Sequence, residues 1–272
     1  MFMRRFGLYW LAFLLSCPVP ARAIEPALVT ITTPRGATLS FILLRPEKPV
    51  ATVVLFAGGH GALGLTDAAT MNWGAGNFLV RTRDRYLAEG LAVAVVDAPS
   101  DKPQGMNAIF RMSKDNVDDV QSLVAHLKSG FGAPVWLVGT SMGTFSAAAA
   151  ALPGSDVDGL VLTSTITRAA PDWVIAGSHP DGVASLALET IHVPTLVVSH
   201  RNDGCDLTPA ADADKLRQRL SGAPIVDVAV LEGELPPKSG PCEAFSPHGF
   251  YGSEDKAVAL ITSFIVRHSQ KQ

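Results

Sequence analysis

The stretch APVWLVGTSMGTFSAAAAAL, residues 133–152, joins an apolar run to an alanine-rich run through a short set of small and polar residues. The first run is typical of a buried strand and the second of a helix. Between them stands Ser141, flanked at a spacing of two by Gly139 and Gly143. A sharp strand-to-helix turn lifts a serine clear of the sheet, and glycines fit where backbone segments come close. We therefore predict that Ser141 is a nucleophile rather than a hydroxyl cap for the next helix.

Short apolar runs alternate with longer amphipathic runs on both sides of this stretch. Strands are expected at residues 51–59, 91–99, 134–140, 158–165, 194–200 and 224–232. Helices are expected at residues 78–90, 113–130, 145–152, 209–220 and 253–268. This alternation predicts an α/β fold with a mostly parallel central sheet and helices on both faces. Residues 27–33 and 37–46 resemble an antiparallel hairpin at the N-terminal edge of that sheet.

The first 23 residues have the three-part layout of a secretory signal peptide. Arg4 and Arg5 precede an apolar run that is too short to span a bilayer, and Ala21-Arg22-Ala23 forms an A-x-A cleavage site. A lipoprotein signal at Cys17 is the alternative. We expect cleavage after Ala23, a periplasmic or extracellular location, and one domain over residues 24–272. Within it, the irregular segment 166–193 is a candidate small lid.

Composition and charge narrow the classes of partner. The formal net charge is −3, and removal of residues 1–23 takes away three arginines and no acid, which leaves −6. This balance argues against nucleic acid or an anionic membrane surface as a partner, and no stable membrane association is expected after cleavage. The sequence has neither the spacing of a zinc site nor a GxxxxGK phosphate loop, so no cofactor is expected.

With Ser141 at a strand-to-helix junction of an alternating chain, the sequence resembles the α/β-hydrolase superfamily, of the serine esterase type. The resemblance covers nearly all of the chain after the signal peptide. In that family the acid follows a late strand, and the histidine lies in a loop before the last helix. LVVSHRNDGC, residues 196–205, and FSPHGFYGSEDK, residues 245–256, stand at these places. The resemblance therefore implies Asp203 as the acid, with Asp206 as the alternative, and His248 as the base.

Other histidines fit the expected place of the base less well, namely His126, His179, His192, His200 and His268.

Acyl chemistry also needs an oxyanion hole. One donor should be the N–H of Met142, which follows the nucleophile. The glycine-rich loop FAGGHGALG, residues 56–64, should supply the second donor, from Gly59 as first choice or His60 as second.

These residues predict a secreted serine hydrolase that cleaves an ester bond of a small-molecule or polymer substrate through an acyl-enzyme intermediate. A peptidase or amidase, an acyltransferase or perhydrolase, and a non-catalytic binding protein remain alternatives. The sequence is also weakly similar to dienelactone-hydrolase-like and polyester-hydrolase members, but the similar stretch is too short to identify the substrate. Trp73, Phe78 and Trp173 are candidates to line the pocket.

Two cysteines remain after the signal peptide. Cys205 lies two residues after Asp203, and Cys242 lies six residues before His248. Because the acid and the base must touch, their loops have to converge, and the cysteines come close together. In an oxidising compartment this arrangement predicts a Cys205–Cys242 disulfide, with two free thiols as the alternative.

Overall fold

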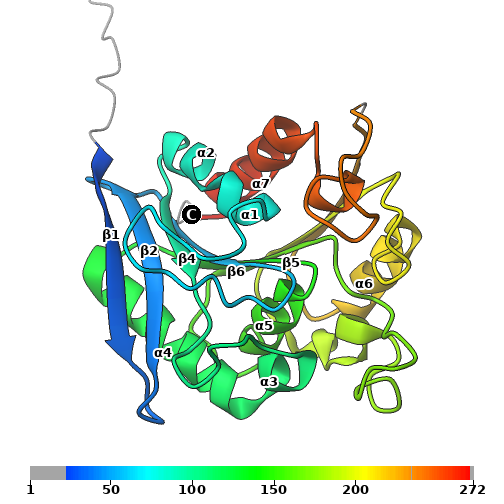
Figure 1. The fold of residues 1–272 in the computed structure, drawn as a ribbon, viewed down its shortest axis with the longest axis horizontal. Coiled ribbons are helices and arrows are strands. Elements are labelled where there is room, and N and C mark those ends of the chain that lie inside the picture. Colours follow the sequence, from blue (N-terminus) through cyan, green and yellow to red (C-terminus); the bar gives the residue numbers. More distant parts are fainter. Residues whose placement is uncertain (1–22, 234, 270–272) are drawn as a thin grey trace, which may run out of the picture.

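The computed structural model describes residues 23–233 and 235–269. The predicted signal peptide, including Cys17, lies outside the described residues except for Ala23, at which the first strand begins. Strands form one sheet in the order β1-β2-β4-β3-β5-β6-β7-β8 (Figure 1). They are β1 (Ala23–Thr32), β2 (Thr38–Pro46), β3 (Thr52–Phe56), β4 (Ala92–Val96), β5 (Val135–Thr140), β6 (Gly159–Thr163), β7 (Thr195–His200) and β8 (Val226–Leu231).

The sheet is mixed, as the sequence predicts. β1 pairs antiparallel with β2, and β2 pairs antiparallel with β4, so the expected N-terminal hairpin is confirmed. All remaining pairs, from β4–β3 to β7–β8, are parallel. The mostly parallel sheet with an antiparallel edge is that of the α/β-hydrolase fold.

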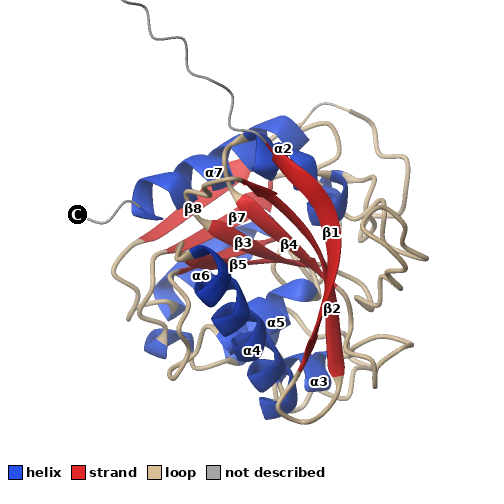
Figure 2. Cartoon of the chain, turned by 90° about the vertical axis from the view of Figure 1, so that its left-hand side faces the viewer, coloured by secondary structure: helices blue, strands red, loops and turns tan. Residues whose placement is uncertain are grey.

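Helices cover both faces of the sheet (Figure 2), with α2 and α7 on one face and α4, α5 and α6 on the other. The helices are α1 (Phe78–Arg81), α2 (Arg83–Ala88), α3 (Ala108–Met112), α4 (Lys114–Phe131), α5 (Gly143–Ala150), α6 (Ala213–Arg219) and α7 (Glu254–Ser269). Short 3-10 turns occur at Gly182–Ser185, Leu188–Thr190, Ala210–Asp212 and Pro247–Gly249. None of the helices in this part of the chain is long and apolar enough to cross a membrane.

Each central strand contributes to two hydrophobic cores, because successive side chains point to opposite faces. In β3, Val54 and Phe56 pack in the core beneath α4 and α5, whereas Val53 and Leu55 pack in the core beneath α2 and α7. All four side chains are buried. This explains why the central strands are continuous apolar runs rather than alternating ones.

Two details differ from the expected helices. The helix expected at residues 78–90 is broken at Thr82, whose hydroxyl donates to the carbonyl of Phe78 at 2.7 Å and competes with the helical pattern. The short helix α3 was not expected. It begins after Asn107, whose side chain accepts the N–H of Phe110 at 2.9 Å and caps the first turn.

Candidate active site

Ser141 occupies a strained backbone position directly after β5. Its φ is 51°, a left-handed conformation that is uncommon for residues other than glycine. The turn is fixed on both sides, because the N–H of Ser141 donates to the carbonyl of Thr163 at 3.1 Å and its carbonyl accepts the N–H of Thr144 at 2.9 Å. Helix α5 begins two residues later. The arrangement raises the serine side chain above the carboxyl end of the sheet.

The two glycines around Ser141 are required by close backbone contacts. A Cβ at Gly139 would lie 2.6 Å from the carbonyl oxygen of Gly143. A Cβ at Gly143 would lie 2.1 Å from the carbonyl oxygen of Phe56 at the end of β3. Any side chain at either position would push the elbow away from the sheet, and this explains the spacing of two that the sequence shows.

Asp203 and His248 come together from loops that follow β7 and β8. The Nδ1 atom of His248 lies 3.1 Å from Oδ2 of Asp203, and their side chains are only 5% and 1% exposed. With Nδ1 directed at the carboxylate, the ring can present Nε2 to a reacting group. Ser141 and His248 line one pocket of about 440 Å³. Among the described residues, no hydrogen bond joins Ser141 to His248.

The surroundings of the acid separate Asp203 from its alternative. Oδ1 of Asp203 accepts the N–H of Cys205 at 2.9 Å, and Oδ2 accepts the hydroxyl of Thr208 at 2.8 Å. The Thr208 hydroxyl also lies 3.0 Å from Nδ1 of His248, so it contacts both members of the pair. Asp206 is exposed and lies outside this network. Thr208 has no signal in the sequence, because a threonine after an acidic loop is unremarkable by itself.

His248, the predicted base, is fixed through its backbone. The carbonyl of His248 accepts the hydroxyl of Ser164 at 2.7 Å, and Ser164 itself has a positive φ of 41° after β6. Phe250, two residues after His248, also has a left-handed conformation and is fully buried. The histidine loop is therefore held against the carboxyl end of the sheet. Among the other histidines, His200 is the buried last residue of β7, and its carbonyl accepts the N–H of Asp203 at 3.0 Å.

The glycine-rich loop after β3 lies directly against Ser141. A Cβ at Gly58 would lie 3.0 Å from the Cβ of Ser141, and Gly58 and Gly59 both line the Ser141 pocket. His60 does not line that pocket; its ring lies 3.8 Å from the ring of Trp73. Within the described chain, the N–H groups of Gly59 and Met142 have no hydrogen-bond acceptor. They are free to bind a developing oxyanion.

A fully buried arginine supports this loop from behind. Arg111 of α3 donates from Nη2 to the carbonyls of Ala57 at 3.3 Å and Gly59 at 3.1 Å. It also donates from Nη1 to the hydroxyl of Ser146 in α5 at 3.2 Å. Burial lowers the pKa of Arg111 to about 10, so the group still carries its charge at neutral pH. The carbonyls of Ala57 and Gly59, on either side of Gly58, are thereby fixed, and a positive charge lies behind the glycine-rich loop.

The far part of the same loop is held by a buried acid. Asp97, directly after β4, accepts the N–H groups of Leu63 at 2.6 Å and Leu65 at 2.8 Å. It also accepts the N–H of Ala98 at 2.7 Å. A carboxylate that accepts several backbone donors fixes a loop that has no regular structure of its own. Neither Asp97 nor Arg111 stands out in the sequence, because their partners lie far along the chain.

The predicted disulfide is present. Cys205 and Cys242 are joined, with a Cα–Cα distance of 4.7 Å and a sequence separation of 37. The bond connects the loop of Asp203 to the loop of His248. Cys242 also lines the Ser141 pocket.

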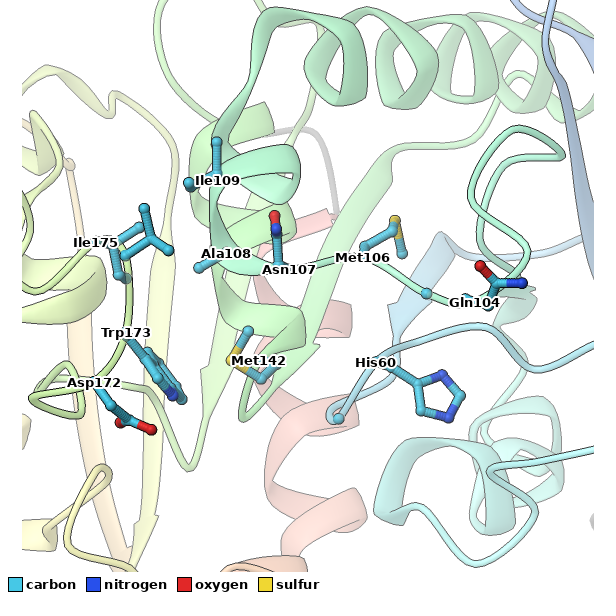
Figure 3. Close-up of a pocket in the computed structure, with 13 residues that line it drawn as sticks. His60, Gln104, Met106, Asn107, Ala108, Ile109, Met142, Asp172, Trp173 and Ile175 are labelled. Atoms are coloured by element: carbon cyan, nitrogen blue, oxygen red, sulfur yellow. The ribbon is translucent and has the colours of Figure 1, made fainter.

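A second and larger pocket, of about 570 Å³, begins at Gly59 and Met142 and runs between α3 and the segment around Trp173 (Figure 3). Gly59 lines both pockets. Of the aromatic residues expected to line a pocket, Trp73 and Phe78 line the Ser141 pocket and Trp173 lines the larger one. The larger pocket therefore adjoins the pocket that Ser141 lines.

Comparisons with known proteins agree with this fold. A family model described as serine aminopeptidase, S33, matches residues 47–218. No curated protein matches the chain in sequence. Among solved structures, an esterase of Pyrococcus furiosus aligns with a TM-score of 0.62 and 16% identity, over 89% of this chain and 92% of that one.

Two further structures share the fold. A cold-adapted esterase from an Arctic intertidal metagenomic library aligns with a TM-score of 0.57 and 12% identity, over 96% of this chain and 100% of that one. Brefeldin A esterase, a bacterial homologue of human hormone-sensitive lipase, aligns with a TM-score of 0.60 and 16% identity, over 95% of this chain and 81% of that one. Fold, strand order and family match together show that the chain belongs to the serine aminopeptidase family of the α/β-hydrolase superfamily.

Proposed function

We propose that the chain is an exported carboxylic ester hydrolase with Ser141, Asp203 and His248 as its catalytic residues. The observation that carries the proposal is the strained Ser141 facing the same pocket as a buried His248–Asp203 pair. A serine hydroxyl is a weak nucleophile until a base accepts its proton, and the pair supplies that base. The likeness of the fold to three esterases supports an ester as substrate.

The reaction follows from the positions of the groups. Oγ of Ser141 attacks the ester carbonyl carbon as Nε2 of His248 accepts the hydroxyl proton. The N–H groups of Met142 and Gly59 bind the oxyanion, and Asp203 stabilises the imidazolium. Collapse of the tetrahedral intermediate breaks the bond to the alcohol oxygen, which takes the proton from His248. Water then attacks the acyl-enzyme with His248 as base, releasing the acid and restoring Ser141.

A covalent label tests the nucleophile. A fluorophosphonate should react once with the wild-type protein, and Ser141→Ala should abolish the reaction while the circular dichroism spectrum is unchanged. Ester turnover should fall by roughly 10⁶, with a residual rate from the oxyanion hole. Ser129→Ala in α4 is the matched control, because Ser129 is exposed, lines neither pocket and should still permit labelling. Labelling of the Ser141→Ala variant at the wild-type rate would reject the assignment.

The family name supports an amide substrate as a second candidate. Aryl esters and aryl amides with the same acyl group distinguish the two, since the acylation chemistry is shared and only the leaving group differs. We expect the ester to be cleaved and the amide to react far more slowly.

Export, with residues 24–272 as one mature domain in the periplasm or outside the cell, is supported by the signal-like start and by the disulfide.

A further inference from the structure

The two pockets share Gly59, but only the smaller one is lined by Ser141 and His248. The pocket of about 440 Å³ contains Ser141 and His248. The pocket of about 570 Å³ contains Met142 but not His248. They meet at Gly59, which lines both. An ester bound for attack on Ser141 can therefore extend one half into each pocket.

The general acid decides which half enters which pocket. His248 has to deliver its proton to the leaving alcohol oxygen, so this oxygen must lie within hydrogen-bond reach of the imidazole. The alcohol half then extends into the pocket that His248 lines. The carbonyl oxygen points to the N–H groups of Gly59 and Met142. The remaining substituent of the carbonyl carbon is the acyl group, and the larger pocket begins at these same two residues.

The walls of the larger pocket indicate what kind of acyl group fits. Its apolar lining includes Met106, Ile109, Trp173, Val174 and Ile175 (Figure 3). Ile109 and Val174 are 47% and 84% exposed and line the same pocket, so they belong to one apolar surface rather than being scattered singly. A hydrocarbon chain in this pocket would cover them.

The polar residues of the same pocket leave no buried charge to face a ligand. The Asn107 side chain is used to cap α3. His60, Gln104 and Asp172 also line the pocket, and all three are exposed to solvent; Asp172 is the acid among them. An amino-terminal ammonium group would need a carboxylate at a fixed place near the carbonyl carbon, and an exposed acid does not provide one.

We propose that the larger pocket is an acyl-binding site for an extended hydrocarbon chain, and that the pocket of His248 and Phe245 receives the alcohol. This assignment rests on the proposed ester hydrolysis at Ser141. It makes Ile109 a residue that determines acyl specificity and Phe245 a residue that determines alcohol specificity. Phe245 is suited to this role because it lines the His248 pocket and is 41% exposed.

Chain-length profiles test the acyl assignment. With p-nitrophenyl esters from acetate to octanoate, wild-type kcat/KM should rise by at most about fourfold for each methylene that becomes buried. Ile109→Asp should lower kcat/KM for octanoate by roughly tenfold or more and leave acetate within about twofold. Ile225→Asp is the matched control, because Ile225 is also partly exposed but precedes β8 at the opposite end of the sheet. It should keep the wild-type profile.

A second series tests the alcohol side. Acetate esters of ethanol, benzyl alcohol and naphthol should show that Phe245→Ala loses the preference for a bulky alcohol and keeps the acyl profile. Ile109→Asp should instead keep the preference for a bulky alcohol and lose the preference for a long acyl chain. The assignment would be overturned if Phe245→Ala changed the acyl preference and Ile109→Asp changed the alcohol preference. It would also be overturned if the wild type hydrolysed acetate and the longer acyl esters equally well. Both outcomes would leave the esterase proposal intact. Preferred cleavage of an aminoacyl ester over the matching acyl ester would also overturn the assignment. If the wild type neither cleaves any ester nor reacts with a fluorophosphonate, both proposals fall.

Discussion

The Nη2 atom of Arg111 lies 3.1 Å from the carbonyl oxygen of Gly59, so a fully buried guanidinium fixes the residue that we propose as the second oxyanion donor. A buried cation without a carboxylate in contact is costly. Here the cost is offset by hydrogen bonds to the carbonyls of Ala57 and Gly59 and to Ser146. Its charge lies behind the loop that carries the proposed oxyanion donor Gly59.

Substitution of this arginine should affect kcat more than KM. Arg111→Met should lower kcat by about tenfold to a hundredfold, less than the loss of a direct oxyanion donor, because the loop loses its fixed position and the nearby charge. Arg111→Lys keeps the charge and should recover part of the rate. Steady-state kinetics with p-nitrophenyl acetate measure both constants. A rise in KM with unchanged kcat in Arg111→Met, or equal rates for the two variants, would contradict this role.

Substitution of Asp203 and of Asp206, the two acids of the loop after β7, should have very different effects on turnover. Asp203→Asn should lower turnover by roughly 10⁴, as in other triads, because the imidazole loses its orientation and the stabilisation of its charged form. Asp206→Asn should stay within about twofold, because Asp206 is exposed and lies outside the network around His248. Rates with one ester at saturating concentration decide the ranking. The reverse order would move the catalytic acid to Asp206.

Thr208 should act as a positioning residue for the acid and the base. Thr208→Val keeps the shape but removes the hydroxyl that lies 2.8 Å from Asp203 and 3.0 Å from His248. We expect turnover to fall by about tenfold, which corresponds to the loss of one hydrogen bond to a charged group. Thr208→Ser restores the hydroxyl and should recover most of the rate. If the serine variant is as slow as the valine variant, packing of the methyl group rather than the hydroxyl explains the loss.

The fold could be predicted from sequence where the pattern is local. The strand and helix on either side of Ser141 follow from adjacent residues, and the glycine spacing follows from contacts inside one turn. The break of the helix at Thr82 could not be predicted, because amphipathic spacing continues through it and only the hydroxyl contact with Phe78 reveals it.

The site was predictable only for residues that carry a positional signal. Asp203 and His248 lie at the loops where the resemblance places an acid and a base, and Cys205 and Cys242 are close to them in sequence. Arg111 has no such signal. It contacts a loop more than fifty residues earlier, and a basic residue in an amphipathic stretch is expected at the surface. Its burial depends on how α3 packs against α5, which the sequence pattern does not encode locally.

His200 should make stability depend on pH. Burial lowers the pKa of this histidine, although Asp203 and Glu232 act in the opposite direction. Its neutral Nδ1 accepts the N–H of Asn202 at 3.1 Å, a bond that protonation would remove. In the unfolded chain a histidine binds its proton near pH 6.5. Below about this pH the unfolded chain therefore binds more protons than the folded one, and stability falls as the pH decreases.

A matched variant isolates this contribution. His200→Asn places a side-chain oxygen where Nδ1 stands, so it can still accept the N–H of Asn202 but has no titration in this range. We expect the Tm of the wild type to fall more steeply between about pH 7 and pH 5 than that of His200→Asn. Differential scanning calorimetry measures both slopes. Equal slopes would show that His200 contributes nothing to the acid sensitivity.

The Cys205–Cys242 disulfide should stabilise the fold and position the catalytic pair. It closes a loop with a sequence separation of 37, for which the chain-entropy model gives about 4 kcal/mol. It also affects the acid directly, because the N–H of Cys205 donates to Oδ1 of Asp203 at 2.9 Å. We expect reduction, or the double variant Cys205→Ala/Cys242→Ala, to lower both the Tm and the turnover measured well below the Tm. Labelling of Ser141 by a fluorophosphonate should slow in parallel, because the label also needs the base. Thiol titration of the unfolded, unreduced protein gives the decisive check, because two free thiols per chain would show that the bond does not form. An unchanged turnover after reduction would show that the bond has no part in positioning Asp203 and His248.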